Sequence, residues 1–158
     1  MDISILLEPI IIDLQKRSGA RAVVLLDPSY HSGDMSTVAG IKSSDVKISL
    51  ENLIEYVNDF AANTKKFLSG INLDDLSAPR SVYISTEERR VYIFRFFVDD
   101  RAEKIPLYLG LTVKKDLDSI LEGKEIPNQI PQFVFDESWK SIKEIQKIYN
   151  RYFHPSNA

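Results

Sequence analysis

The residues that most often carry out catalysis or bind metals are few in this sequence and lie far apart. There are two histidines, His31 and His154, and no cysteine. The missing cysteines exclude disulfides, thiol catalysis and the usual structural zinc ligands. Asp34 follows His31 closely and could complete a dyad, but SYHSGD has the composition of a solvated loop. We therefore expect neither a metal site nor a catalytic histidine.

The glycines do not form a phosphate-binding pattern. Beyond residue 30 they occur singly, at Gly33, Gly40, Gly70, Gly110 and Gly123. A P-loop or a dinucleotide fingerprint needs closely spaced glycines, so the chain is not itself a P-loop GTPase. Two acidic pairs, Asp74-Asp75 and Asp99-Asp100, fall in predicted turns, where solvated carboxylates are favoured over a weak cation site. No nucleophilic triad can be selected either, so we expect no enzymatic activity and no cofactor.

The charge balance favours a protein partner over nucleic acid. The formal net charge is −3, whereas a nucleic-acid surface needs a basic face. Tyr92, Phe94 and Phe96 share one face of a predicted strand and could stack bases of a single strand. No lysine cluster lies near them in the sequence, so packing in the core is the favoured interpretation.

Two groups of charged residues are candidates for a functional role. Glu87, Glu88, Arg89 and Arg90 form a predicted connection between two strands. It is either a solvated turn or a partner contact, since charged tips help to set docking specificity. Arg95 lies in the middle of an otherwise apolar strand face, where an unpaired buried charge would be costly. We expect it to reach an edge or to pair with a helix acid, which is a structural role.

A long amphipathic helix is predicted to organise the elements that carry these residues. Residues 49–69 read SLENLIEYVNDFAANTKKFLS, and their apolar side chains recur at helical spacing on one face. That face comprises Leu50, Leu53, Ile54, Val57, Phe60, Ala61, Thr64 and Leu68. Ser49 is the predicted N-cap and Gly70 the predicted end. We expect this helix to lie across one face of a sheet, with two other helices flanking it.

The other elements are read from the same periodicities. Residues 2–17 predict a helix that is kinked at Pro9 or begins near Glu8, and that ends at Gly19. Strands are predicted at 20–27, 37–41, 81–85, 91–98 and 105–113, and a short helix at 116–122. In 91–98 both alternating faces are largely apolar, so we expect both to be covered.

The segment after residue 123 differs in composition. Residues 125–135 contain two prolines and are predicted to be extended. Asp136 is then predicted to cap a helix that runs to about Tyr152. Its apolar stripe holds Trp139, Ile142, Ile145, Tyr149 and Tyr152. This stripe either covers the sheet of its own chain or binds a partner. We therefore divide the chain into a domain of residues 1–123 and a C-terminal extension of residues 124–158.

The predicted order is α-β-β-α-β-β-β-α with an added C-terminal helix. It defines an α/β sandwich with a five-stranded, mainly antiparallel sheet. This order resembles the Roadblock (dynein light chain) family, which shares its plan with longin domains. The resemblance rests on RSG before the strand ARAVVLLD, on the central helix, and on PLYLGLTVKKDLDSIL, which is similar to the last strand and closing helix. The loop DPSYHSGD is longer than the tight turn of the family, and residues 124–158 are additional.

The resemblance implies a non-catalytic module that forms a homodimer or a Roadblock-like heterodimer and offers a platform to a small Ras-like GTPase. Tyr56, Asn63 and Lys66 are the candidates for dimer contacts, and residues 87–90 for a partner contact. One alternative is a small-molecule sensor domain of the PAS or GAF type, which needs a cavity between sheet and helix. Another is a profilin-like actin-binding protein, which needs more strands after the central helix.

Nothing in the sequence predicts membrane insertion or secretion. The first residues are apolar but carry Asp2, Glu8 and Asp13 without a basic leader, which is unlike a signal peptide. No apolar run is long enough to span a bilayer. We therefore expect a cytoplasmic protein.

Overall fold

The computed structural model describes residues 3–27, 36–42, 50–71, 80–85, 89–100, 103–114 and 132–153. Several predicted features lie outside these residues, namely His31, Asp34, Ser49, Asp74, Asp75, Glu87, Glu88, the helix 116–122 and His154. The predicted boundary at Gly123 also lies outside them, so the division into two segments stays a prediction.

A five-stranded sheet forms the centre of the molecule, as predicted. Its strands are β1 (Ala22–Asp27), β2 (Ser36–Lys42), β3 (Ser81–Ser85), β4 (Arg89–Asp100) and β5 (Glu103–Lys114). They lie in the order β2-β1-β5-β4-β3, and every neighbouring pair is antiparallel. β1 therefore lies inside the sheet, between its hairpin partner β2 and the late strand β5.

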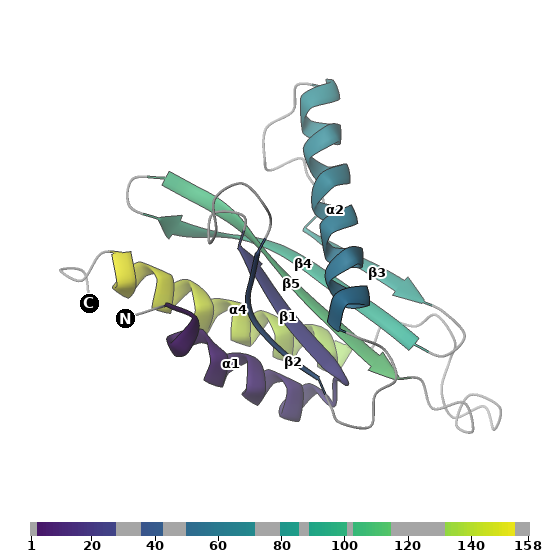
Figure 1. The fold of residues 1–158 in the computed structure, drawn as a ribbon, viewed down its shortest axis with the longest axis vertical. Helices are drawn as coiled ribbons and strands as arrows, with labels where there is room; N and C mark the ends of the chain where they lie inside the picture. The colour runs from purple at the N-terminus through teal and green to yellow at the C-terminus, as the bar shows by residue number, and fades with distance from the viewer. Residues whose placement is uncertain are drawn as a thin grey trace.

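Three helices cover the two faces of this sheet. They are α1 (Ile3–Ser18), α2 (Leu50–Ile71) and α4 (Gln132–Phe153). Figure 1 shows α1 and α4 side by side on one face and α2 on the other. The predicted place of the central helix, across one face, is confirmed. The first helix lies on the opposite face together with the C-terminal helix. The other predicted flanking helix, 116–122, lies outside the described residues.

The first helix runs through Pro9, so the alternative start near Glu8 is wrong. Proline removes the N–H that would bond the carbonyl of Ile5. Ile5 is 60 % exposed, so this side of the helix faces water, which can take the place of the missing donor. The helix ends as predicted at Gly19, whose φ of 73° favours glycine.

The central helix continues beyond its predicted end. α2 includes Gly70 and Ile71. Glycine permits the left-handed conformation that ends a helix but does not impose it, so its presence alone did not fix the end. The predicted buried face is confirmed where side chains are described, because Leu53, Val57 and Phe60 are all buried.

The last helix begins earlier than predicted. α4 starts at Gln132, directly after Pro131, so the predicted extended conformation is wrong for residues 132–135. Proline is well suited to the start of a helix, where its missing N–H costs nothing. Val134 is 4 % exposed and packs in the core, so burial also stabilises this first turn.

The hairpin of β4 and β5 is longer than predicted at both ends. Arg89 and Arg90 were assigned to a turn and lie in β4, as do Asp99 and Asp100. Asp99 pairs with Lys104 across the hairpin. Opposite charges at paired positions stabilise a sheet, so this pair favours the extension. Arg89 lies opposite Lys114 and Asp100 opposite Glu103, so charge pairing does not explain the extension at those positions.

The alternation predicted for β4 is confirmed. Its two faces contribute to two separate core clusters, one beneath α1 and α4 and one beneath α2. The first cluster contains Tyr92, Phe94, Phe96 and Val98, and the second contains Val91 and Ile93. Both faces of the strand are therefore covered.

Candidate interaction surfaces

The outer face of α2 carries the predicted dimer contacts. Tyr56 is 38 % exposed, and Asn63 is exposed as well. The side chain of Lys66 lies outside the described residues. Figure 1 shows α2 crossing the sheet near its N-terminal end and then running beyond it. This arrangement leaves a long stretch of helix that does not rest on the described strands.

A glycine on β5 sets how closely α2 approaches the sheet. A Cβ atom built on Gly110 would lie 2.5 Å from Cγ2 of Val57. Val24 and Leu53 are also close, at 3.4 and 3.5 Å. No real Cβ tolerates the first distance, so the helix sits where only glycine fits beneath it. This close packing fixes the direction in which the rest of α2 projects.

The short strand β3 forms one edge of the described sheet. The N–H of Arg95 donates to the carbonyl of Arg80 at 2.7 Å, so these two residues form a hydrogen-bonded pair. Such pairs alternate along an antiparallel ladder. Ser81, Tyr83 and Ser85 therefore direct their backbone N–H and C=O groups away from β4. All five β3 residues are half-buried, and no described strand lies beside this edge.

The predicted charged connection of residues 87–90 is only partly described, because Glu87 and Glu88 lie outside the described residues. Arg89 and Arg90 lie in β4, and Arg90 is only 5 % exposed. Its Nε donates to the hydroxyl of Tyr83 at 3.1 Å. A partner role for residues 87–90 remains a prediction, and the buried Arg90 offers a partner much less surface than a turn residue would.

Arg95 lies on the same side of the sheet as α2 and is 4 % exposed. Its guanidinium lies 4.6 Å from the centre of the Phe97 ring, a cation–π arrangement. The expected placement on an apolar face is confirmed. An aromatic face is the contact that the sequence reading missed, although Phe97 lies on the same face two residues later.

The helix α4 is tied to the rest of the chain by polar contacts as well as by its apolar stripe. The hydroxyl of Tyr149 donates to a carboxylate oxygen of Asp27 at 2.7 Å, and both residues are buried. Arg17 of α1 pairs with Glu137 and donates to the hydroxyl of Ser141 at 2.8 Å. Ile142, Ile145 and Tyr149 of the predicted stripe are buried against their own chain, whereas Tyr152 is 38 % exposed.

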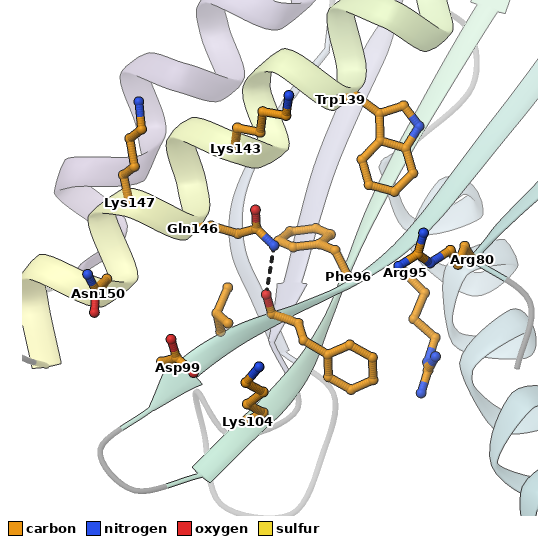
Figure 2. A pocket seen from close by; sticks show the side chains of 12 residues that line it. Arg80, Arg95, Phe96, Asp99, Lys104, Trp139, Lys143, Gln146, Lys147 and Asn150 are labelled. Atoms are coloured by element: carbon orange, nitrogen blue, oxygen red, sulfur yellow. Dashed lines mark hydrogen bonds between the residues drawn. The ribbon is translucent and has the colours of Figure 1, made fainter. Parts of the chain in front are cut away.

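A groove separates α4 from the outer edge of β4 near the end of the hairpin. It encloses about 620 Å³, and we call it the β4–α4 groove. Its lining includes Arg80, Arg95, Asp99, Lys104, Lys143 and Lys147 (Figure 2). The sequence did not predict this groove. Lys143 and Lys147 are spaced one helical turn apart in the sequence, but nothing in the sequence indicates that they lie beside β4.

Two further features of the described residues concern metal-binding clusters and membrane-spanning helices. No cluster of three or more His, Asp or Glu side chains among them could hold a metal ion. None of the described helices is long and apolar enough to cross a membrane.

The pKa of the buried Tyr92 is shifted from its usual value. Burial raises the pKa of Tyr92 well above its usual range, because the charged phenolate would lose its hydration. Tyr83 acts in the same direction, whereas Arg90 lowers the pKa. The hydroxyl of Tyr92 has no hydrogen-bond partner among the described residues, so this group packs in the core and takes part in no network.

Comparison with solved structures identifies the class of fold: an α/β fold of the Roadblock/longin type, with a C-terminal helix. The particular structures are of MglB. The chain matches MglB of Myxococcus xanthus with a TM-score of 0.61 and 12 % identity, covering 92 % of this chain and 95 % of that one.

Two further MglB structures agree with this likeness. MglB in a tetrameric arrangement matches with a TM-score of 0.60 and 14 % identity, covering 96 % of this chain and 93 % of that one. The gliding protein MglB from Thermus thermophilus gives 0.57 and 15 %, covering 94 % and 90 %. The matched spans extend past Gly123, so the likeness includes part of residues 124–158. No protein-family model and no curated protein sequence matches the chain.

Proposed function

We propose that this protein is a non-catalytic scaffold or regulator that forms a dimer and presents a surface to a small Ras-like GTPase. The fold supports this proposal, as does the likeness to solved structures of MglB, which in one of them has a tetrameric arrangement. The observation that carries it is the combination of an open β3 edge with a helix that projects beyond the sheet.

These two features suit a self-complementary interface. Val82 and Ile84 of β3 pack against the same core cluster as Leu53 and Val57 of α2, so the edge and the helix belong to one side of the molecule. Pairing of two β3 edges would extend the sheet, and the exposed Tyr56 faces would meet across the axis of the dimer. We include Asn63 and Lys66 in this contact.

A regulator of this kind needs no reactive group of its own. Hydrolysis by a small GTPase can be accelerated by positioning the residues that the GTPase already has. We place residues 87–90 at the contact with the partner. Such a partner would make the protein cytoplasmic. We assign residues 124–158 to an extension that completes the cover of the sheet.

The packing of α2 counts against a small-molecule sensor. A ligand cavity is expected between sheet and helix in that class. At Gly110 the two are so close that a single methyl group would collide with Val57. The described part of this interface therefore leaves no room for a ligand where the helix crosses β5.

The dimer can be tested at the β3 edge. Ser81→Pro removes an N–H that points away from β4, so the internal ladder keeps its bonds while the edge loses a donor. Ser81→Ala is the matched control, since it keeps the N–H. We expect light scattering to show a dimer for the wild type and the control, and a weakened dimer for Ser81→Pro. A monomeric wild type would contradict the dimer.

The partner can be tested with purified small GTPases from the same organism, each loaded with GDP or with a non-hydrolysable GTP analogue. We expect binding that depends on the nucleotide and is weakened by Glu87→Lys with Glu88→Lys, which reverses two charges at the proposed partner contact. Absence of binding to every GTPase in either state would contradict the proposed function.

A further inference from the structure

The β4–α4 groove has a shape that none of the proposed contacts uses. β3 pairs with β4 only from Arg90 to Phe94, and the last bond between them joins Arg95 to Arg80. From Phe96 to Asp100, β4 has no strand beside it among the described residues. This stretch of β4 pairs with β5 on its inner side, so its outer side is a second edge that no described strand covers.

The backbone groups on this edge are directed into the groove. The alternation that points the N–H of Arg95 outwards also points the N–H and C=O of Phe97 and Asp99 outwards. The side-chain amide of Gln146 confirms this direction, because it donates to the carbonyl of Phe97 at 2.9 Å (Figure 2). The carbonyl thus already accepts a hydrogen bond from outside the sheet.

The lining of the groove comes from both faces of the sheet. Phe96 and Val98 face α4, whereas Arg95 and Phe97 face the side of α2. The hollow therefore follows the strand edge, with α4 forming one wall. An occupant of this groove would lie along β4 and bond its backbone, as a peptide does in strand addition.

The charge of the lining selects the kind of occupant. Among the described residues that line the groove, five are basic and only Asp99 is acidic. This excess stands against a formal net charge of −3 for the whole chain. Lys143 and Lys147 are exposed, and among the described residues no carboxylate forms an ion pair with either. Their charges are therefore available to an acidic partner.

The aromatic residues near the groove do not suit nucleic acid. Stacking of bases needs free ring faces. Phe94 is fully buried, with Trp139 and Phe135 at 5.5 and 5.1 Å from its ring centre. The Phe97 ring lies under the guanidinium of Arg95. The groove thus combines a strand edge with positive charge, and the rings of Phe94 and Phe97 are already in contact with other side chains.

We propose that the β4–α4 groove binds an acidic peptide segment of a partner protein, in an extended conformation that adds a strand to the outer edge of β4. Carboxylates of the peptide reach the exposed amines of Lys143 and Lys147. This site lies at a different edge from the proposed dimer contact and does not depend on a GTPase partner.

The only tryptophan of the chain, Trp139, lines the groove and reports on its occupancy. The probe is a short peptide of alternating Glu and Thr, and the matched control replaces each Glu by Gln. We expect a saturable change in tryptophan fluorescence with the Glu peptide, at least about tenfold weaker binding of the Gln peptide, and weakening by salt.

Charge reversal on α4 tests where the peptide binds. Lys143→Glu with Lys147→Glu is expected to weaken binding at least about tenfold. Lys16→Glu with Lys114→Glu changes the net charge equally, and both positions are exposed outside the groove. This control should bind as the wild type does. Circular dichroism and the oligomeric state should be the same for both variants.

Three outcomes would overturn the proposal. The first is no fluorescence change with the Glu peptide, and the second is equal weakening by the two charge reversals. The third is tighter binding of single-stranded oligothymidylate or of anionic lipid vesicles than of the peptide, which would make the groove a general polyanion site. Failure of the dimer or GTPase tests would leave each of these measurements interpretable.

Discussion

The two faces of the sheet are covered in different ways. On one face α1 and α4 lie side by side over β1, β2 and β4, and their contacts include the buried bond from Tyr149 to Asp27. On the other face α2 packs over β1, β5 and β2 and then runs past the sheet. α1 and α4 lie over the sheet along their length, whereas part of α2 runs beyond the sheet, and we propose this part for contact with another chain.

Truncation of matched aromatic residues is the strongest way to test this contrast. Phe94→Ala removes a fully buried ring that packs against two rings of α4, and should cost about 3–5 kcal/mol in unfolding free energy. Phe60→Ala, at the margin of the α2 face, should cost at least about 1 kcal/mol less because that site can relax into solvent. Urea denaturation measures both, and equal losses would break the contrast.

The closest contact beneath α2 gives the next largest effect. Gly110→Ala places a methyl group against Val57, and overpacking of this kind costs about 1–3 kcal/mol. Val57→Ala in the same chain should recover part of the loss, because it removes the colliding atom. Urea denaturation of the single and double variants tests this. Additive losses would show that the glycine does not set the position of the helix.

The smallest effect concerns the buried hydroxyl of Tyr92. Since its pKa is raised in the folded protein, the unfolded chain loses this proton first as pH rises. The free energy of unfolding should therefore fall above about pH 10, and Tyr92→Phe should reduce that fall. At neutral pH the variant should be neutral or up to about 1 kcal/mol more stable, because the hydroxyl lacks a partner among the described residues.

Denaturation curves at neutral and alkaline pH measure both effects of Tyr92→Phe. Tyr56→Phe is the control, since this side chain is 38 % exposed on α2. The control should follow the wild type across the pH range. An identical alkaline loss in wild type and Tyr92→Phe would show that burial of this phenol does not couple to stability.

Much of the fold could be predicted from the sequence because single elements carry their own periodicity. The alternation in β4 predicted two covered faces, and the spacing of Leu53, Val57 and Phe60 predicted the buried face of α2. The ends of helices and strands were harder to predict. Gly70 permits a helix end without requiring it, and Asp99 extends its strand because Lys104 lies opposite.

The surfaces were less accessible to prediction because they depend on residues distant in sequence. The sequence predicts Arg90 to be an exposed turn residue, because its contact with Tyr83 forms only in the folded sheet. The groove needs Gln146 of α4 to lie at the carbonyl of Phe97, about fifty residues earlier in the chain. Only tertiary packing brings these groups together, so periodicity along the sequence carries no signal for them.

The bond between Asp27 and Tyr149 also has a consequence for biosynthesis. During translation the ribosome releases Asp27 long before Tyr149, and β1 must wait for β5 as well. Until then the apolar segment from Ala22 to Leu26 has α1 and β2 beside it, but its edge toward β5 stays unpaired. A nascent chain of this kind is vulnerable to aggregation, and it gains most from a chaperone that shields its first strand until the last helix emerges.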